Sequence, residues 1–203
     1  SRFVQQPQER AEVAKIAISV LATLRGSICL YQGEELGLPE AELSFEDLRD
    51  PYGIRFWPAF KGRDGCRTPM VWHKGKTQAG FSTAKPWLPV SVEHAALAVD
   101  QQEKDKASVL AHYRAVLAFR KTHPALIDGD MHFLATNEDV LAFTRKKGDE
   151  QLLFVFNLRR GPQEIAVPHG LTIKESIAMP GLSGQVVDGE IRLGSLDGFC
   201  AWV

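Results

Sequence analysis

The chain has 203 residues, 44% of them hydrophobic and 24% charged, as in a globular protein that buries a substantial core in one or two domains. Its formal net charge of −1 provides no electrostatic basis for binding nucleic acid or an anionic membrane. Its apolar runs fall well short of the roughly 20 residues that cross a bilayer, so we expect no membrane segment.

A helix is the first element that the sequence predicts. Pro7 and the nearby acidic residue Glu9 favour the start of a helix, and Gly26 favours its end. Apolar residues repeat between them at helical spacing: Val13, Ile16, Ala17, Val20, Leu21 and Leu24. The apolar run at 27–31 then predicts a short strand buried on both faces, and helix, turn and buried strand are typical of an α/β barrel or an open parallel sheet.

From residue 32 to about 104 the sequence has little periodicity and predicts a long loop region. A connection of this length is unusual in a compact domain unless it carries function. Within it, residues 62–72 read GRDGCRTPMVW, and we call this segment the arginine loop. Its glycines permit a sharp turn, and the guanidinium of Arg67 offers a rigid fork of donors. Two interpretations stay open from these residues: an arginine–aspartate pair that only holds the loop together, or an arginine aimed at a polyhydroxylated ligand.

The second half of the chain predicts one more helix and then strands. Val109, Tyr113, Val116, Leu117 and Arg120 mark the helix, which should end before Pro124. Short strands are expected at 131–134, 140–145, 152–158, 164–167, 172–179, 185–187, 190–193 and 199–203. Asp188-Gly189 is a strong hairpin signal between two of them. The pattern is that of an antiparallel β-sandwich domain.

Several sequence blocks carry a resemblance to a known family. The arginine loop is similar to a loop late in the catalytic barrel of glycoside hydrolase family 13, in its α-glucosidase and oligo-1,6-glucosidase branch. The segment LYQGEELG at 30–37 resembles the eighth barrel strand of that family and its following turn. Blocks of the same kind, in the same order, are DPYG at 50–53, FWP at 56–58, AGFS at 79–82 and PWLPV at 86–90.

The resemblance implies a fold class of α/β followed by all-β. Residues 1–125 would be the last part of a (β/α)8 barrel, and residues 126–203 a C-terminal antiparallel β domain. Retaining glycosidases use two carboxyl groups about 5 Å apart. The family places these groups, and a third aspartate in an Asn-His-Asp motif, on segments that the sequence does not contain. It therefore resembles the C-terminal portion of a retaining α-glucosidase that lacks the catalytic carboxylates and is inactive alone.

The resemblance also assigns candidate substrate-binding residues. In the family, the arginine at the position of Arg67 contacts the glucose in the subsite that is cleaved, and Asp64 would brace it. Glu34 and Glu35 are adjacent on a segment expected to be extended, so they point apart and receive a structural role. For Phe56, Trp57 and Trp87 we expect a small loop core more than stacking on sugar rings.

The implied partners are glucose-containing oligosaccharides and either the missing N-terminal part of the barrel or a second copy of the chain. Two alternatives share the motifs, a transglucosidase and a sucrose or trehalose isomerase. A non-enzymatic carbohydrate-binding module is a further alternative. Neither the six histidines nor Cys29, Cys66 and Cys200 show metal-ligand spacing, so we expect no metal and no cofactor. Cys29 is expected to be a buried thiol, and the three free cysteines suggest the cytoplasm.

Overall fold

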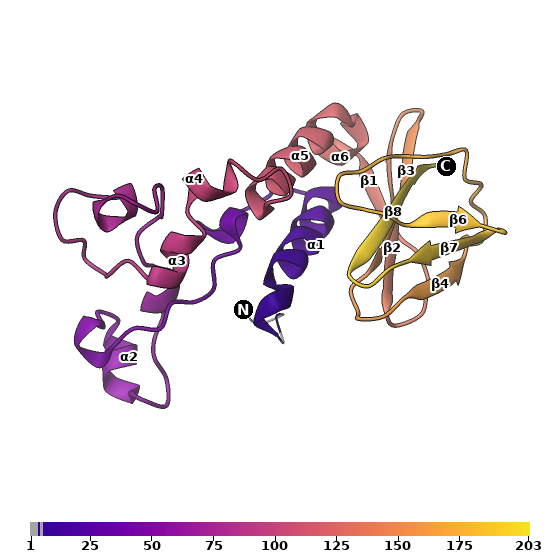
Figure 1. Ribbon diagram of the computed structural model, residues 1–203. Coiled ribbons are helices and arrows are strands. Elements are labelled where there is room, and N and C mark those ends of the chain that lie inside the picture. Colours follow the sequence, from indigo (N-terminus) through magenta and orange to yellow (C-terminus); the bar gives the residue numbers. More distant parts are fainter. Residues whose placement is uncertain (1–3, 5) are drawn as a thin grey trace. The chain divides into compact units, whose positions relative to one another are not determined.

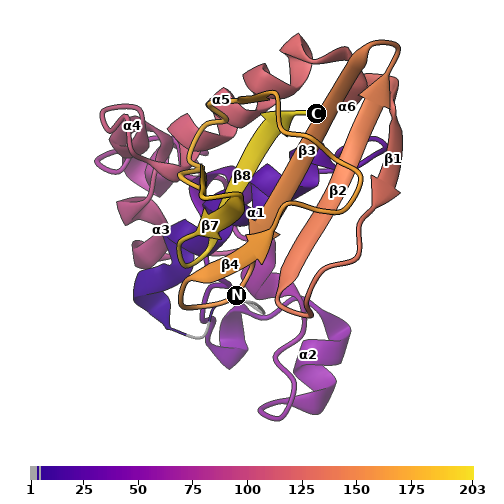
Figure 2. The same ribbon diagram turned by 90° about the vertical axis from the view of Figure 1, so that its right-hand side faces the viewer.

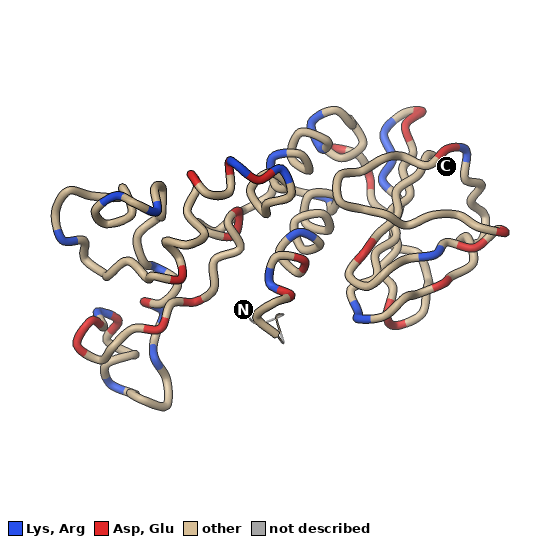
Figure 3. Tube along the Cα trace, viewed as in Figure 1, with Lys and Arg blue, Asp and Glu red and all other residues tan. Residues whose placement is uncertain are grey.

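The computed structural model describes residue 4 and residues 6–203 (Figure 1). Their contacts form two compact units. Unit 1 combines the residues up to Ala11 with Leu30–Ala111, and unit 2 combines Glu12–Cys29 with His112–Val203. These units do not coincide with the domains predicted from the sequence, residues 1–125 and 126–203, and that domain boundary stays a prediction. Basic and acidic residues are both distributed over the two units (Figure 3).

Both predicted long helices are present. A short 3-10 turn, Pro7–Glu9, leads into α1 (Arg10–Thr23), and Gly26 follows its end with a φ of 110°. α5 (Val109–Thr122) forms where the second helix was expected and ends before Pro124, and a further short helix, α6 (Pro124–Asp128), follows it. Among the described residues, no helix is both long and apolar enough to cross a membrane.

The strand predicted at 27–31 does not form, and the expected burial of Cys29 is wrong. These residues belong to no sheet, and Cys29 is exposed. A strand needs a hydrogen-bonded neighbour on at least one side. In the described part of the chain no other segment pairs with residues 27–31, so the apolar pattern alone does not produce a strand.

Unit 1 consists of short elements joined by loops, as the weak periodicity predicts. Their bounds are Glu34–Leu36, Phe45–Asp47, Asp64–Cys66 and Thr77–Gly80 for the 3-10 turns, and Pro51–Phe56 (α2), Val92–Ala96 (α3) and Val99–Gln102 (α4) for the helices. A small apolar core supports them, built from Leu36, Met70, Val71, Ala79, Ala98 and Leu110. This core anchors both the turn after residue 33 and the end of the arginine loop.

Unit 2 contains two antiparallel sheets. One has the strand order β1-β2-β3-β8-β5 and the other β4-β7-β6. Figure 2 shows β1, β2, β3 and β8 side by side. The strands are β1 (Asp130–Phe133), β2 (Val140–Lys147), β3 (Glu150–Asn157), β4 (Gln163–Ala166), β5 (Glu175–Ser176), β6 (Gln185–Val187), β7 (Glu190–Leu193) and β8 (Asp197–Trp202).

The strand pattern agrees with the sequence in all but one segment. Asp188 and Gly189 have φ values of 52° and 83° and connect β6 to β7 as a tight hairpin, as predicted. The strand expected at 172–179 is reduced to the two residues of β5, which pair only with the end of β8. Side chains from β2, β3, β7 and β8 form the core: Val140, Ala142, Leu153, Val155, Ile191, Leu193, Phe199 and Ala201.

Two buried arginines in unit 2 bind the C-terminal end of α1. The guanidinium of Arg120 on α5 donates to the carbonyl oxygens of Ala22 at 2.6 Å and Gly26 at 2.8 Å. The fully buried Arg145 on β2 donates to the carbonyl oxygen of Thr23 at 2.7 Å. Carbonyl groups in the last turn of a helix have no partner within the helix, and positive charge is favourable there. The two arginines therefore supply the cap of α1.

Candidate functional site

The arginine loop is held from its N-terminal side by a buried carboxylate. Asp64 is fully buried at the start of the 3-10 turn Asp64–Cys66. Its Oδ2 accepts hydrogen bonds of 2.6 Å from the backbone amides of Arg49 and Asp50. Its Oδ1 has no hydrogen-bond partner, and it is the only buried side-chain polar atom in the described residues of which this is true. Asp64 thus joins the loop to the segment before α2.

A second carboxylate, that of Asp50, braces the same loop. It caps α2 by accepting from the amide of Tyr52 at 3.1 Å, and it accepts from Arg63 through the amide at 3.0 Å and Nε at 2.9 Å. The hydrogen bond from the Arg63 guanidinium lowers the pKa of Asp50 to about 2. Asp50 thus braces the loop against the start of α2. The ion pair of the loop is Asp50–Arg63, whereas Asp64 binds backbone amides.

Three glycines allow the backbones around the loop to lie in close contact. A Cβ atom on Gly53 would lie 2.6 Å from the carbonyl oxygen of Lys61, and one on Gly62 would lie 2.9 Å from the Cα of Gly53. A Cβ on Gly65 would lie 2.5 Å from the carbonyl oxygen of Ala41. Gly62 also has a φ of 77°, which other residues rarely adopt. The glycines therefore fix the path of the loop against α2 and residue 41.

A histidine holds the loop from its C-terminal side. Thr68 and His94 are both buried, and the Thr68 hydroxyl lies 3.2 Å from Nδ1 of His94 on α3. Nε2 of the same ring lies 2.8 Å from the carbonyl oxygen of Pro39. Burial lowers the pKa of His94 below its ordinary value, which favours the neutral ring.

Arg67 lies between these two anchors and is exposed. Its backbone amide donates to the carbonyl oxygen of Asp64 at 2.9 Å, so its main chain is fixed. Its guanidinium takes part in no hydrogen bond or ion pair with the described residues. A guanidinium that is free on a rigid backbone is available to bind hydroxyl or carboxylate oxygens.

The aromatic residues of unit 1 differ from the expected loop core. Phe56 and Trp87 are exposed, Trp87 at 68%, and only Trp57 is half-buried, 5.8 Å from the ring of Phe45. The expectation of a core is wrong for Phe56 and Trp87, because backbone hydrogen bonds and the carboxylates of Asp50 and Asp64 hold this part of the chain together.

The pair Glu34-Glu35 lies in the 3-10 turn Glu34–Leu36, although an extended segment was expected. Glu35 accepts from the amide of Gly33 at 2.8 Å. Glu35 thus holds the turn locally.

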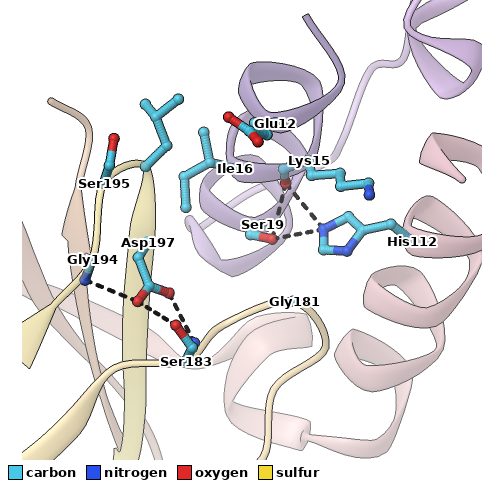
Figure 4. A pocket seen from close by; sticks show the side chains of 11 residues that line it. Glu12, Lys15, Ile16, Ser19, His112, Gly181, Ser183, Gly194, Ser195 and Asp197 are labelled. Atoms are coloured by element: carbon cyan, nitrogen blue, oxygen red, sulfur yellow. Dashed lines mark hydrogen bonds between the residues drawn. The ribbon is translucent and has the colours of Figure 1, made fainter. Parts of the chain in front are cut away.

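Unit 2 contains a pocket of about 240 Å³ between α1, α5 and the loop before β8 (Figure 4). Its buried polar side chains are already bonded within the protein. Asp197 accepts from the amides of Ser183, Gly194 and Gly198, and from the Ser183 hydroxyl at 2.6 Å. His112 Nε2 lies 3.1 Å from both the Ser19 hydroxyl and the Lys15 carbonyl oxygen. These groups hold the loop and the helices, so the arginine loop is the better candidate site.

Comparison with known proteins finds relatives of the chain among carbohydrate enzymes. The family model "Alpha amylase, catalytic domain" matches residues 1–129. The chain is 47% identical over 203 residues to a probable alpha-glucosidase of Rhizobium meliloti, covering 99% of this chain and 36% of that protein. It is 28% identical over 193 residues to an oligo-1,6-glucosidase of Parageobacillus thermoglucosidasius, covering 86% of this chain and 34% of the relative.

Solved structures of carbohydrate enzymes also resemble the chain. The alpha-glucosyl transfer enzyme XgtA is 50% identical with a TM-score of 0.88, over 95% of this chain and 36% of that one. An isomaltulose synthase from Erwinia rhapontici, in complex with its natural substrate sucrose, is 27% identical with a TM-score of 0.83, over 100% of this chain and 40% of that one. The chain thus spans about a third of the length of the curated relatives it matches.

Proposed function

Since the chain belongs to the α-amylase family of glycoside hydrolases, we propose that it is the C-terminal portion of a retaining α-glucosidase that hydrolyses α-glucosidic bonds of small oligosaccharides. The similarity to an alpha-glucosidase over nearly the whole chain supports this proposal. In it, residues 1–125 complete the catalytic barrel and residues 126–203 form the β domain, and the protein works in the cytoplasm.

Arg67 is the substrate-binding residue of this proposal, and Asp64 is its brace. The observation that carries the assignment is the exposed guanidinium of Arg67, unbonded on a loop that is fixed at both ends. Such a group can donate to two neighbouring sugar hydroxyls at once. The loop therefore needs no rearrangement before it binds a glucose unit.

Substitution of Arg67 in the full-length enzyme tests the assignment. Arg67→Ala should lower kcat/KM for isomaltose or maltose by about 10- to 150-fold, because hydrogen bonds to a charged group contribute about 1.5–3 kcal/mol. Lys85→Ala is the matched control, since Lys85 is another exposed cation of unit 1 with no partner among the described residues. Wild-type kinetics in Arg67→Ala would refute the assignment.

The chain by itself is inactive in this proposal. The family's catalytic carboxylates lie on segments that its sequence does not contain, and binding energy from one arginine does not replace a nucleophile. Purified chain should show no hydrolysis of p-nitrophenyl α-glucoside, whereas the full-length enzyme should hydrolyse it. We also propose that the isolated chain associates with itself or with the rest of the barrel, and a single monomer peak in size-exclusion chromatography would contradict this.

A second candidate function within the family is glucosyl transfer or sucrose isomerisation. The similarity to an alpha-glucosyl transfer enzyme at 50% identity favours transfer. Hydrolysis and transfer differ in whether water or another hydroxyl group attacks the covalent intermediate. Product analysis of the full-length enzyme with sucrose or maltose separates them: free glucose indicates hydrolysis, and new glucosides or sucrose isomers indicate the alternative.

A further inference from the structure

His94 makes two hydrogen bonds whose chemistry fixes its tautomer. The carbonyl oxygen of Pro39 can only accept, so Nε2 of His94, 2.8 Å away, carries the proton. In the neutral ring Nδ1 is then an acceptor, and the hydroxyl of Thr68 donates to it at 3.2 Å. The histidine therefore joins three separate segments: the turn at residue 39, α3 and the arginine loop.

Burial makes this bridge specific. His94 is 2% exposed and Thr68 is 6% exposed, so water does not replace either hydrogen bond if a partner is lost. The lowered pKa of His94 keeps the ring neutral at neutral pH. The neighbouring Glu93 accepts a 2.7 Å bond from Nη1 of Arg10, which adds a tie between α3 and the start of α1.

Arg67 lies directly beside the residue that His94 holds. On its other side Asp64 is fixed by the amides of Arg49 and Asp50, at 2.6 Å each. The backbone of Arg67 is thus set by two buried contacts, and its side chain has none with the described residues. Loss of the Thr68 bond leaves only the core contacts of Met70 and Val71 to hold the C-terminal side of the loop, and the guanidinium then samples more orientations.

We infer that His94 is a positioning residue for substrate binding, which acts by holding Thr68 so that the guanidinium of Arg67 faces the glucose unit. The inference rests on the proposed function of Arg67. His94 itself does not contact the substrate, but its loss should change KM because it acts through the hydroxyl group of Thr68.

The experiment uses a set of substitutions in the full-length enzyme. His94→Gln places an amide near the position of Nε2 and keeps the Pro39 bond, whereas His94→Asn places an oxygen near Nδ1 and keeps the Thr68 bond. Thr68→Val removes the hydroxyl at constant shape. We expect His94→Gln and Thr68→Val each to raise KM for isomaltose or maltose by about three- to tenfold, and His94→Asn to raise it less.

Combination with Arg67→Ala separates positioning from general damage. If His94 acts through Arg67, then His94→Gln has no further effect on KM once Arg67 is alanine. If Arg67→Ala raises KM but His94→Gln and Thr68→Val do not, the inference is overturned and the proposed function stands. If Arg67→Ala leaves KM unchanged, the proposed function fails and the inference fails with it.

Nitrogen NMR of the imidazole provides a test that does not depend on the folding of a variant. In the unsubstituted enzyme Nε2 of His94 should be protonated and Nδ1 should not. A neutral ring protonated on Nδ1 would overturn the inference.

Discussion

Arg145→Met should destabilise unit 2 far more than the same substitution at Lys146, the next residue of β2. The guanidinium is fully buried on β2 and donates to the carbonyl oxygens of Thr23 at 2.7 Å and Gly129 at 3.0 Å. Methionine has a similar length and packs in the same space, but it cannot donate. The substitution therefore leaves the end of α1 and the start of β1 without a buried donor.

The magnitude follows from these two bonds. Hydrogen bonds from a charged donor contribute about 1.5–3 kcal/mol each, which gives about 3–6 kcal/mol for the pair. Removal of a buried charge recovers part of this, because the desolvation of the guanidinium is no longer needed. We expect a net loss of about 2–3 kcal/mol in the free energy of unfolding. For a chain of this size that lowers Tm by about 4–12 °C.

Thermal unfolding followed by far-ultraviolet circular dichroism measures the effect. Lys146→Met is the matched control, since Lys146 is the next residue of β2 and is exposed. It should change the free energy of unfolding by about 0.5 kcal/mol or less. If Arg145→Met and Lys146→Met have the same Tm, the capping role of Arg145 is wrong.

Other expected outcomes concern unit 2 as well. Gly181→Ala should lower Tm more than Gly170→Ala: both glycines have positive φ, but only at Gly181 would a Cβ meet a ring, 2.3 Å from Cε1 of His112. Similar Tm values for the two variants would argue against this contact. Burial lowers the pKa of His112 below 6.5, so at low pH the unfolded chain binds more protons than the folded chain. The contribution of His112 to the free energy of unfolding should therefore be complete above pH 6.5 and decrease as the pH falls below it. Urea unfolding above and below pH 6.5 measures this change. In His112→Gln the free energy of unfolding should depend less on pH. Burial raises the pKa of the Cys200 thiol, whereas Cys29 and Cys66 are exposed. Native protein should therefore react with a thiol reagent at Cys29 and Cys66 and not at Cys200. Rapid labelling of all three cysteines would contradict this expectation.

Local patterns of the sequence predicted the regular elements well. The apolar repeat before Gly26, the repeat after Val109 and the Asp188-Gly189 turn each depend on neighbouring residues, and all three are present. The strand at 27–31 depends on a partner strand, which an apolar run cannot reveal.

The contacts that support the candidate site were less accessible from the sequence. Asp64 was expected to brace the loop, but its partners are backbone amides, which carry no sequence signal. The sequence gives no sign that His94 contacts the loop, because its partner Thr68 lies 26 residues away. Arg120 and Arg145 fit the helix and strand patterns and gave no sign of binding carbonyl groups 98 and 122 residues away.

The glycines in the arginine loop and in the neighbouring α2 limit which positions of the loop can be varied. Gly53, Gly62 and Gly65 leave no space for a side chain, so a combinatorial library that varies them should contain few folded members. Cys66 lies next to Arg67 and is exposed, so it can be randomised at little structural risk. A library built on the arginine loop should therefore vary position 66 and keep the three glycines constant.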